Sequence, residues 1–527
     1  MGDGRATLRR AVGPIARLPL HPLLLAAYAV LFVYAANIGE VLPEDIVAPL
    51  SLALAAAAIV LAICAALFRD LRRGAILTSA LLGTFAFFGH IASLLDAEVI
   101  TEPVQLALWA AFVVLAGTYA ALARSSLSTV TATLNAFGLV LVAITLFTIL
   151  PFESGRAARA SEGTPMVVGS ALATATRVPE RDIYFLVFDR YGSDWAIKQR
   201  FGIDNDLYPD LEEAGFQVIP GARANYRATD FSLASMLSME LLDDLTASVG
   251  PGSSDRTPAR ARIPRHEVGK FLRANGYRYY HLGAWYGPTR SNEIADEVRR
   301  WDNTTELEAV LREATILPTL ERLAGLAPQD DAFRDRHRNE ALFEFRQIRR
   351  LADTPGRKFV FAHILLPHPP YGFDADGGIV LKETELSAIA EGREGDLFAE
   401  QLAFTNDKIR ETISVLLDRP ADEQPIIVIT GDEGPFICGN VDCIDGSPEA
   451  YGTRFGTLRA YHLPDLDYAV PSDDTGVNIF RMLFREYFGA DLPDLPNRSY
   501  DWPDNENLYD FRDVTDELPL PGGEGSG

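Results

Sequence analysis

The sequence predicts an N-terminal bundle of five transmembrane helices, followed by a water-soluble α/β domain with a mostly parallel sheet flanked by helices. Two observations predict this class. Nearly all the long apolar stretches of the 527-residue chain lie before residue 152, and nearly all the charge lies after it. After residue 180, short apolar runs alternate with amphipathic helical patterns, which is typical of a parallel sheet covered by helices. The length is enough for two or three domains.

The charge balance excludes one large class of partner. The chain has 48 basic and 72 acidic residues, a formal net charge of −24. A chain this acidic repels a phosphate backbone, so no nucleic acid is expected as a partner. The 48% hydrophobic and 10% aromatic content excludes wholesale disorder.

Five segments are apolar, carry no Lys, Arg, Asp or Glu, and have about the 20 residues that a helix needs to cross a bilayer. They are residues 18–38, 46–68, 75–95, 104–122 and 130–150. A cleaved signal peptide could account for the first segment but not for the other four. Buried helices of a soluble protein would need five consecutive helices without a polar face. We therefore predict a multi-pass membrane domain.

The loops between these segments alternate in charge. Basic residues precede the first segment and follow the second and fourth: Arg5, Arg9, Arg10, Arg17, Arg69, Arg72, Arg73 and Arg124. The other two loops carry Glu40, Glu44 and Asp45, then Asp96, Glu98 and Glu102. Positive charge is retained in the cytoplasm, so we expect the N-terminus inside and everything after Pro151 outside the cytoplasmic membrane.

Composition suggests the domain boundaries. We predict a cytoplasmic tail at residues 1–17, the transmembrane domain at 18–151, and a Ser-, Gly- and Ala-rich linker at 152–179. The α/β domain is expected at 180–500, and the acidic, Gly-rich tail at 501–527 is expected to be disordered. Within the domain, apolar runs predict strands at 183–188, 279–282, 359–364, 426–430 and 458–462. Helical patterns occupy 264–274, 305–326, 335–351 and 395–417.

Two of the three cysteines lie close together in the outside domain. Cys438 and Cys443 are separated by four residues, in a compartment that permits disulfides. A metal site is the alternative, but no further Cys or neighbouring His completes four soft ligands. We expect a disulfide, which contributes about 2 kcal/mol by restricting a small loop in the unfolded chain.

Carboxylates follow two of the predicted strands. Asp189 follows residues 183–188, and Asp432 and Glu433 follow residues 426–430. In open α/β sheets, ligands bind at the carboxyl ends of the strands. Carboxylates gathered there repel one another unless a cation lies between them. Asp and Gly after a strand also form plain turns, so a metal site and simple turns both remain open on this pattern alone.

A third element lies between them, at residues 225–237. It is expected to be a loop that enters a helix near Phe231. In one interpretation, Thr229 or Asp230 is only the N-cap of that helix. In the other, Thr229 is a nucleophile at a helix N-terminus, where amides and the helix dipole favour a phosphate. A threonine hydroxyl needs activation, which a divalent cation can supply.

The order of these motifs is similar to that of a known family. Asp189, then Asn225-x-x-x-Thr229-x-x-Ser232, then Pro367-His368-Pro369-Pro370-Tyr371, then Gly431-Asp432-Glu433-Gly434 resembles the sulfatase-like branch of the alkaline phosphatase superfamily. The resemblance covers roughly residues 180 to 490. With five preceding spans, the layout looks like that of lipoteichoic acid synthases and membrane-anchored phosphoglycerol or phosphoethanolamine transferases.

The resemblance implies roles for individual residues. Asp189, Thr229, Asp432 and Glu433 are expected to surround one divalent metal ion, with Thr229 becoming covalently phosphorylated. His368 matches a histidine that faces the substrate phosphate, and His281 is expected to match another. Asn225 is expected close to the nucleophile, on the substrate side.

The chain departs from the family at one position. The family usually has Gly-Asp-His-Gly where this chain has Gly431-Asp432-Glu433-Gly434. A carboxylate in place of imidazole favours Mn²⁺, Mg²⁺ or Ca²⁺ over Zn²⁺. True sulfatases carry Cys or Ser at the nucleophile position, so Thr229 disfavours sulfate-ester hydrolysis. His363, on the strand before His368, fits either a core residue or a support of the site.

Together these features give the functional hypothesis. The chain is expected to be a metal-dependent phosphoryl-transfer enzyme that acts on a membrane phospholipid head group or an envelope glycan phosphodiester. The alternative is a domain that has lost its chemistry and serves as a binding or assembly partner in the envelope. Glu433 in place of His is the feature that keeps this alternative open.

Overall fold

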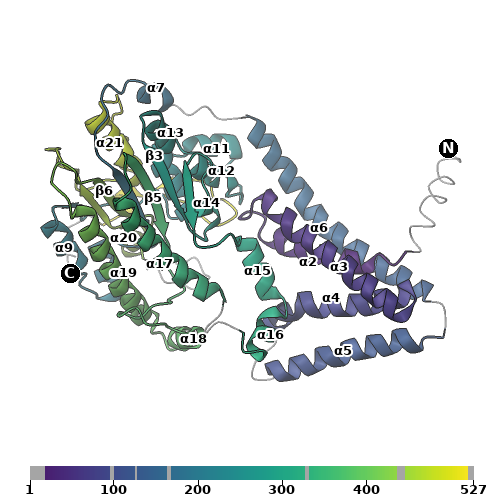
Figure 1. The fold of residues 1–527 in the computed structure, drawn as a ribbon. Helices are drawn as coiled ribbons and strands as arrows, with labels where there is room; N and C mark the ends of the chain where they lie inside the picture. Colours follow the sequence, from purple (N-terminus) through teal and green to yellow (C-terminus); the bar gives the residue numbers. More distant parts are fainter. Residues whose placement is uncertain are drawn as a thin grey trace, which may run out of the picture. The chain divides into compact units, whose positions relative to one another are not determined.

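The computed structural model describes residues 18–94, 100–124, 127–162, 168–326, 332–435 and 446–519. The chain forms two compact units, coloured by sequence in Figure 1. Unit 1 comprises Met1–Glu162 and Thr304–Ala327, and unit 2 comprises Gly163–Asn303 and Pro328–Gly527. The predicted α/β domain at 180–500 is therefore wrong in one respect. A segment from its middle belongs to unit 1.

Unit 1 contains five apolar helices: α2 (His21–Ala36), α3 (Val47–Phe68), α4 (Leu71–Leu94), α5 (Glu102–Leu122) and α6 (Ser128–Glu162). Four of them are long and apolar enough to cross a membrane. The first, α2, has 16 residues, fewer than the roughly 20 that a crossing needs. Five spans were predicted, and in the described part of the chain four meet the length criterion.

The short helix α2 is held inside the bundle. It packs against α3, α4 and α6. Near its start, the backbone N–H groups of Leu20 and His21 donate to the side-chain oxygen of Asn135 on α6, at 2.9 and 2.8 Å. His21 Nδ1 lies 2.6 Å from the hydroxyl oxygen of Ser79 on α4. These bonds satisfy helix-end amides that an apolar environment leaves without water.

The predicted linker at 152–179 is also partly wrong. Helix α6 runs through Pro151 and ends at Glu162, and α7 covers Val168–Leu172. A proline within a helix removes one backbone bond, yet the flanking residues continue the helix here. The Ala- and Arg-rich sequence after Pro151 supports this continuation, because both residues have high helix propensity.

Unit 2 is built on a seven-stranded sheet in the order β2-β7-β6-β1-β5-β3-β4. The strands are β1 (Ile183–Phe188), β2 (Gln217–Val218), β3 (Arg278–Gly283), β4 (Glu297–Arg300), β5 (Lys358–Ile364), β6 (Ile426–Gly431) and β7 (Arg459–His462). All pairs from β6 to β4 are parallel, and only β7 pairs antiparallel with β6 and β2. The predicted mostly parallel sheet is confirmed.

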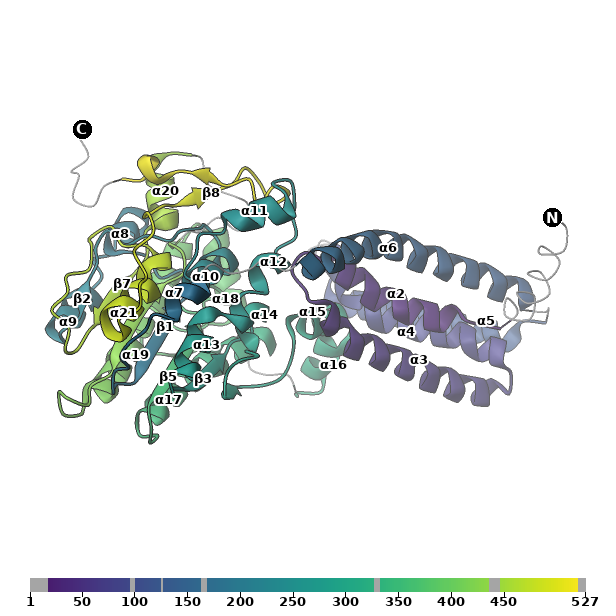
Figure 2. The same cartoon turned by 90° about the horizontal axis from the view of Figure 1, so that it is seen from above.

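Alternate residues of the central strand β1 face two separate cores. Phe185 and Val187 pack with α10 (Thr229–Ser238), α13 (Glu267–Ala274) and α21 (Ile479–Phe488). Tyr184 and Leu186 pack with α9 (Leu207–Glu213), α17 (Ala332–Ala352) and α19 (Glu394–Leu417). Figures 1 and 2 show these helices on the two faces of the sheet. A strand buried on both faces explains the uninterrupted apolar run of β1.

The remaining helices are short, and of these η1, α15 and α16 belong to unit 1 and the others to unit 2. They are η1 (Pro43–Ile46), α8 (Asp194–Phe201), α11 (Asp243–Val249), α12 (Thr257–Arg260), η2 (Ile263–Arg265), α14 (Gly287–Arg290), α15 (Glu306–Ala314), α16 (Leu317–Leu323), α18 (Lys382–Ala390), α20 (Pro448–Phe455), η3 (Gly476–Asn478) and η4 (Thr515–Glu517).

The C-terminal segment is folded as far as the structure describes it, to residue 519. Strand β8 (Tyr500–Asp501) pairs antiparallel with β9 (Arg512–Asp513). Trp502 and Tyr509 are buried in the core that contains Phe231 of α10. The prediction of a disordered tail at 501–527 is wrong for residues 501–519, because their aromatic side chains bury enough apolar surface to order a polar sequence.

Candidate functional site

Two aspartates meet at the carboxyl edge of the sheet. Asp189 directly follows β1 and Asp432 directly follows β6, and these strands pair in parallel with Phe188 opposite Gly431. Both side chains are buried. Asp432 Oδ1 accepts hydrogen bonds from the backbone N–H of Arg190 at 3.0 Å and of Glu433 at 2.8 Å. Parallel pairing therefore brings together two of the predicted metal ligands.

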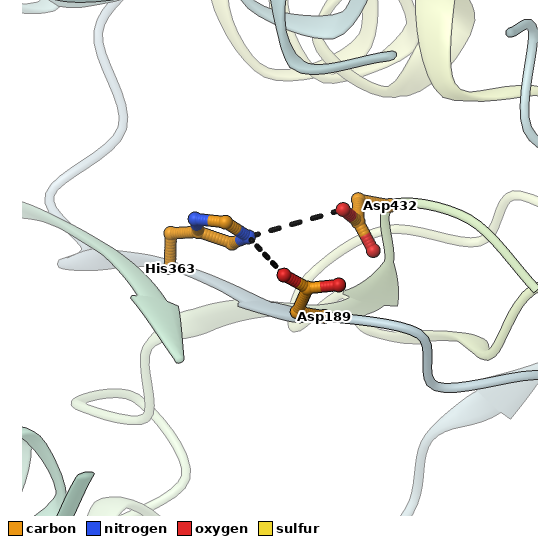
Figure 3. A group of neighbouring side chains, drawn as sticks. All are labelled: Asp189, His363 and Asp432. Carbon is orange, nitrogen blue, oxygen red and sulfur yellow. Dashed lines mark ion pairs between the residues drawn. The ribbon is translucent and has the colours of Figure 1, made fainter. Parts of the chain in front are cut away.

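A histidine from the neighbouring strand completes this group. His363 lies on β5, which pairs with β1 so that His363 is opposite Val187. Its Nε2 is 3.9 Å from Asp189 Oδ2 and 3.9 Å from Asp432 Oδ2. Figure 3 shows the imidazole ring directed at both carboxyl groups. Asp189, His363 and Asp432 each offer a ligand atom, and these atoms lie within 4.8 Å of one another.

The polar atoms of this group fit a metal ion. In the described part of the chain, Asp189 Oδ1, Asp432 Oδ2 and His363 Nε2 are buried without a hydrogen-bond partner. Ligand atoms about 2.0–2.2 Å from one ion are spaced by a few ångströms, as are His363 Nε2 and the Oδ2 atoms of Asp189 and Asp432. Buried polar atoms without partners are costly, and a divalent cation would satisfy all three.

The pKa values in the group reflect burial and the repulsion between neighbouring carboxylates. Burial, then the charges of Asp432 and Glu433, raise the pKa of Asp189 well above its usual value. Burial and Glu433 raise the pKa of Asp432 to about 7, although a side-chain hydrogen bond with Thr229 opposes this. Burial lowers the pKa of His363 to about 3, so its imidazole is neutral and able to bind a cation.

Thr289 holds the His363 ring. Its hydroxyl oxygen lies 3.1 Å from His363 Nδ1 and 3.5 Å from the carbonyl oxygen of Tyr286. If the hydroxyl donates to Tyr286, His363 Nδ1 donates to the hydroxyl and the Nε2 lone pair faces the aspartates. This is the tautomer that a metal ligand needs, and such outer hydrogen bonds fix the orientation of the ligating ring.

A substitution at Thr289 tests this support. Thr289→Val keeps the side-chain shape and removes the hydroxyl, so the His363 ring loses its hydrogen bond. We expect Mn²⁺ affinity, measured by isothermal titration calorimetry, to fall about 10- to 100-fold. Thr289→Ser keeps a hydroxyl and serves as the matched control. Equal affinity of the valine and serine variants would contradict a role for this hydroxyl.

Thr229 is the first residue of α10, and the N-cap is Ala228. The predicted helix start near Phe231, with Thr229 or Asp230 as the cap, is therefore wrong by two residues. The Thr229 side chain instead forms a hydrogen bond with Asp432. Asp230 is buried in ion pairs with Arg256 at 3.1 Å and Arg260 at 3.0 Å. Thr229 thus lies at a helix N-terminus and beside the aspartates.

Glu433 lies outside the group of possible metal ligands found in the described residues. Its Oε1 is 3.4 Å from Arg190 Nε, and its Oε2 is 3.3 Å from a terminal nitrogen of Arg454. Both residues lie in the bend that follows β6, where Asp432 faces the group and Glu433 faces the arginines. The group of possible ligands therefore contains His363, and the ligand role predicted for Glu433 stays a prediction.

His368 lies in the loop after β5 and is half-buried. Gln401 on α19 fixes this loop, donating to the carbonyl oxygen of His368 at 2.9 Å and accepting from the N–H of Gly372 at 2.7 Å. Burial, then Arg190, lowers the pKa of His368 well below its usual value, and His363 contributes to the same shift. His368 is therefore neutral, and it lies near enough to Arg190 and His363 for both to affect its pKa.

Two further residues that were predicted to bind substrate, Asn225 and His281, form hydrogen bonds with backbone groups of the protein. Both ends of the buried Asn225 amide bond to backbone, donating to Arg498 O at 2.8 Å and accepting from Val477 N at 2.7 Å. His281 is fully buried on β3, with Nε2 2.7 Å from the Thr289 carbonyl oxygen. Asn225 fixes the loop before Thr229, and His281 supports the residue that holds His363. Cys438 and Cys443 lie outside the described residues.

The pH dependence of ion binding follows from the raised aspartate pKa values. Without an ion, Asp432 is protonated below about pH 7, so protons compete with the metal. A raised carboxyl pKa also means that the ion-free fold loses stability as pH rises from about 4 through about 7. We expect the increase in unfolding temperature caused by Mn²⁺ to be small at pH 5 and large at pH 8. An equal increase at both pH values would contradict this assignment.

No family model and no curated protein matches the chain. Similar solved structures include the periplasmic domain of the phosphoethanolamine transferase EptC from Campylobacter jejuni (12% identity, 63% of this chain and 94% of that one, TM-score 0.36). A putative sulfatase from Bacteroides thetaiotaomicron is also similar, with 12% identity over 60% of this chain and 72% of that one and a TM-score of 0.39. So is a protein in the alkaline phosphatase superfamily from Vibrio parahaemolyticus, with 13% identity over 66% of this chain and 81% of that one and a TM-score of 0.37. Likeness of this degree does not identify an activity.

Proposed function

We propose that this chain is a membrane-anchored, metal-dependent phosphoryl-transfer enzyme of the sulfatase-like branch of the alkaline phosphatase superfamily. Its substrate is a phospholipid head group or another envelope phosphodiester, and Thr229 is the nucleophile. One observation carries the proposal. Three buried ligand atoms from Asp189, His363 and Asp432 converge, and the Thr229 side chain is hydrogen-bonded to one of these residues.

The donor set defines the cofactor. Asp189, Asp432 and His363 would hold one divalent ion together with the Thr229 hydroxyl. An ion held there lowers the pKa of the hydroxyl and offsets negative charge on the phosphoryl oxygens. The predicted preference for Mn²⁺, Mg²⁺ or Ca²⁺ over Zn²⁺ depended on an all-oxygen set. With the imidazole of His363, Mn²⁺ and Zn²⁺ both suit the donors.

The chain's own residues account for the first step. The Thr229 oxygen attacks phosphorus, the bond to the leaving oxygen breaks, and the phosphoryl group becomes bound to threonine. The hydrogen bond with Asp432 gives the hydroxyl proton an acceptor when attack begins. The N-terminus of α10 offsets negative charge on the phosphoryl group, because its first amides have no partner within the helix.

His368 suits the proton transfers. Its Nδ1 contacts the carbonyl oxygen of Pro369. A carbonyl only accepts, so Nδ1 carries the proton and Nε2 of the neutral ring is free to accept one. In the second step His368 takes a proton from water or from an acceptor hydroxyl, which attacks the phosphothreonine. The protonated Asp432 returns its proton to the Thr229 oxygen as that oxygen leaves, and the imidazolium of His368 loses its proton to solvent. The leaving oxygen of the first step takes its proton from water.

The alternative, a binding domain without chemistry, depended on the missing imidazole at position 433. An imidazole from β5 lies beside both aspartates, so this departure no longer favours loss of function.

The apolar helices of unit 1 support a membrane location. We place the N-terminus in the cytoplasm and unit 2 outside, because the basic loops follow the positive-inside rule. Turnover of phosphatidylglycerol or phosphatidylethanolamine by the Mn²⁺-loaded chain, and its loss in Thr229→Ala, tests the proposal.

A further inference from the structure

A segment from the middle of the soluble part belongs to the helical unit. Thr304–Ala327 is part of unit 1, although unit 2 residues flank it on both sides. It contains α15 and α16, and α15 packs against α2 and α4. Figure 1 shows α15 and α16, in teal, beside the purple helix α4. The chain therefore connects the two units three times, after residues 162, 303 and 327.

The contacts of this segment with the bundle are specific. Leu307 is 2% exposed and packs in a cluster with Val33 and Tyr34 of α2 and Ile149 of α6. A Cβ atom added to Gly89 of α4 would lie 2.3 Å from the carbonyl oxygen of Glu313. Only a glycine allows the backbone of α15 to approach α4 this closely.

Polar bonds complete the attachment. The Ile316 N–H donates to the Phe85 carbonyl oxygen of α4 at 3.0 Å. Glu102, the first residue of α5, accepts from the Thr319 hydroxyl at 2.5 Å and pairs with Arg322 at 2.5 Å. Arg312 pairs with Glu321. The charges near α16 thus have partners within unit 1.

Three leucines in α16 and just after it are exposed. Leu320, Leu323 and Leu326 are 46%, 69% and 77% exposed. Adjacent helices carry similar apolar side chains at the ends to which the segment is bonded, with Leu94 of α4 80% exposed and Val104 of α5 47% exposed. Exposed apolar side chains therefore occur both on the segment and on the helix ends to which it is bonded. Contiguous exposed apolar surface indicates a contact with a membrane or a partner.

The end of the helical bundle to which the segment attaches indicates which leaflet of the membrane it would contact. The segment attaches where α4 ends and α5 begins, and its Leu307 packs near the end of α2. The loop after α2 carries Glu40, Glu44 and Asp45 and no basic residue. These are the ends that the positive-inside rule assigns to the outside, the side on which unit 2 is proposed to lie.

We propose that residues 304–326 form an interfacial element, and that Leu320, Leu323 and Leu326 enter the acyl region of the outer leaflet. Short amphipathic helices lie in this way at the level of the head groups, with paired charges above and leucines below. The element anchors the soluble unit to the bilayer a second time, so its substrate edge shares the effective concentration of lipid head groups. The inference rests on the proposed membrane topology and not on the proposed chemistry.

The test measures where these side chains lie. The full-length chain, with Cys64, Cys438 and Cys443 replaced by serine, is spin-labelled at Leu323→Cys and reconstituted in phosphatidylglycerol–phosphatidylcholine nanodiscs. Accessibility to oxygen, which concentrates in lipid, is compared with accessibility to a water-soluble nickel chelate. Both references belong to unit 1: Leu108→Cys on α5, 57% exposed, for lipid, and the exposed Glu44→Cys for water.

We expect the oxygen-to-nickel ratio at Leu323 to match that at Leu108 and to be several-fold higher than at Glu44. A second label at Leu326→Cys is expected to give the same result. A ratio at Leu323 like that at Glu44 would place the segment in water and overturn the proposal. Protection from both reagents would show that a protein covers this face, which also overturns it. The measurement needs no turnover, so its failure leaves the proposed phosphoryl transfer intact.

Discussion

Thr229→Ala is expected to abolish turnover of a lipid phosphodiester, with kcat at least about 10³-fold lower. Losing the nucleophile of a covalent mechanism removes the intermediate, and in a serine protease the loss is about 10⁶-fold. The measurement is release of diacylglycerol from phosphatidylglycerol in mixed micelles at saturating Mn²⁺. Thr229→Ser keeps a hydroxyl at the same place and should retain measurable activity.

Two controls separate this effect from structural damage. Metal content is measured for each variant, because Thr229 is also a proposed ligand, and the alanine variant should stay inactive when fully loaded. Thr174→Ala removes an exposed hydroxyl that, among the described residues, bonds to the backbone groups of Ala171 and Asp491. We expect it to leave turnover unchanged. If loaded Thr229→Ala stays within about tenfold of the parent, another group is the nucleophile.

His363→Gln is expected to remove the metal ion. The glutamine preserves most of the buried volume but does not offer the imidazole lone pair that faces Asp189 and Asp432. Bound Mn²⁺ or Zn²⁺ should fall from about one ion per chain to nearly none after gel filtration, with at least a 100-fold weaker Kd, because even outer-shell changes weaken such sites about 10- to 100-fold. Elemental analysis and calorimetry measure both.

Glu433→Gln is the matched variant. It removes one charge next to Asp432 without removing a ligand, since Glu433 pairs with Arg190 and Arg454. We expect it to keep its ion, with a change in Kd of less than about tenfold. The sequence pattern predicted the opposite order, in which Glu433 is a ligand and His363 is not. Loss of the ion from Glu433→Gln alone would restore that earlier assignment.

The positions of the two aspartates were predictable because their cause is local. Each follows an uninterrupted apolar run, and the ends of parallel strands share one edge of a sheet. The direction of Glu433 was not predictable from the same pattern. It depends on two arginines, and Arg454 comes from a helix that only tertiary packing brings to the strand end.

His363 illustrates a different limit. From the sequence, a histidine one residue before the end of a strand is as compatible with a core position as with a role as a metal ligand. It becomes a ligand candidate only because β5 lies next to β1, and this order of strands depends on contacts between residues about 175 positions apart. The only available signal was its place near the carboxyl end of a predicted strand. The Cys438–Cys443 disulfide stays a prediction.

Hydrophobic patterning within the chain determined by itself that there would be an apolar helical unit, a mostly parallel sheet, and carboxylates at the strand ends, because these follow from the periodicity of neighbouring residues. Tertiary structure alone decided that His363 joins Asp189 and Asp432, that residues 501–519 fold into the core, and that residues 304–326 attach to the helical unit. Each of these depends on which apolar surfaces meet, and that is a property of the whole chain rather than of any one segment.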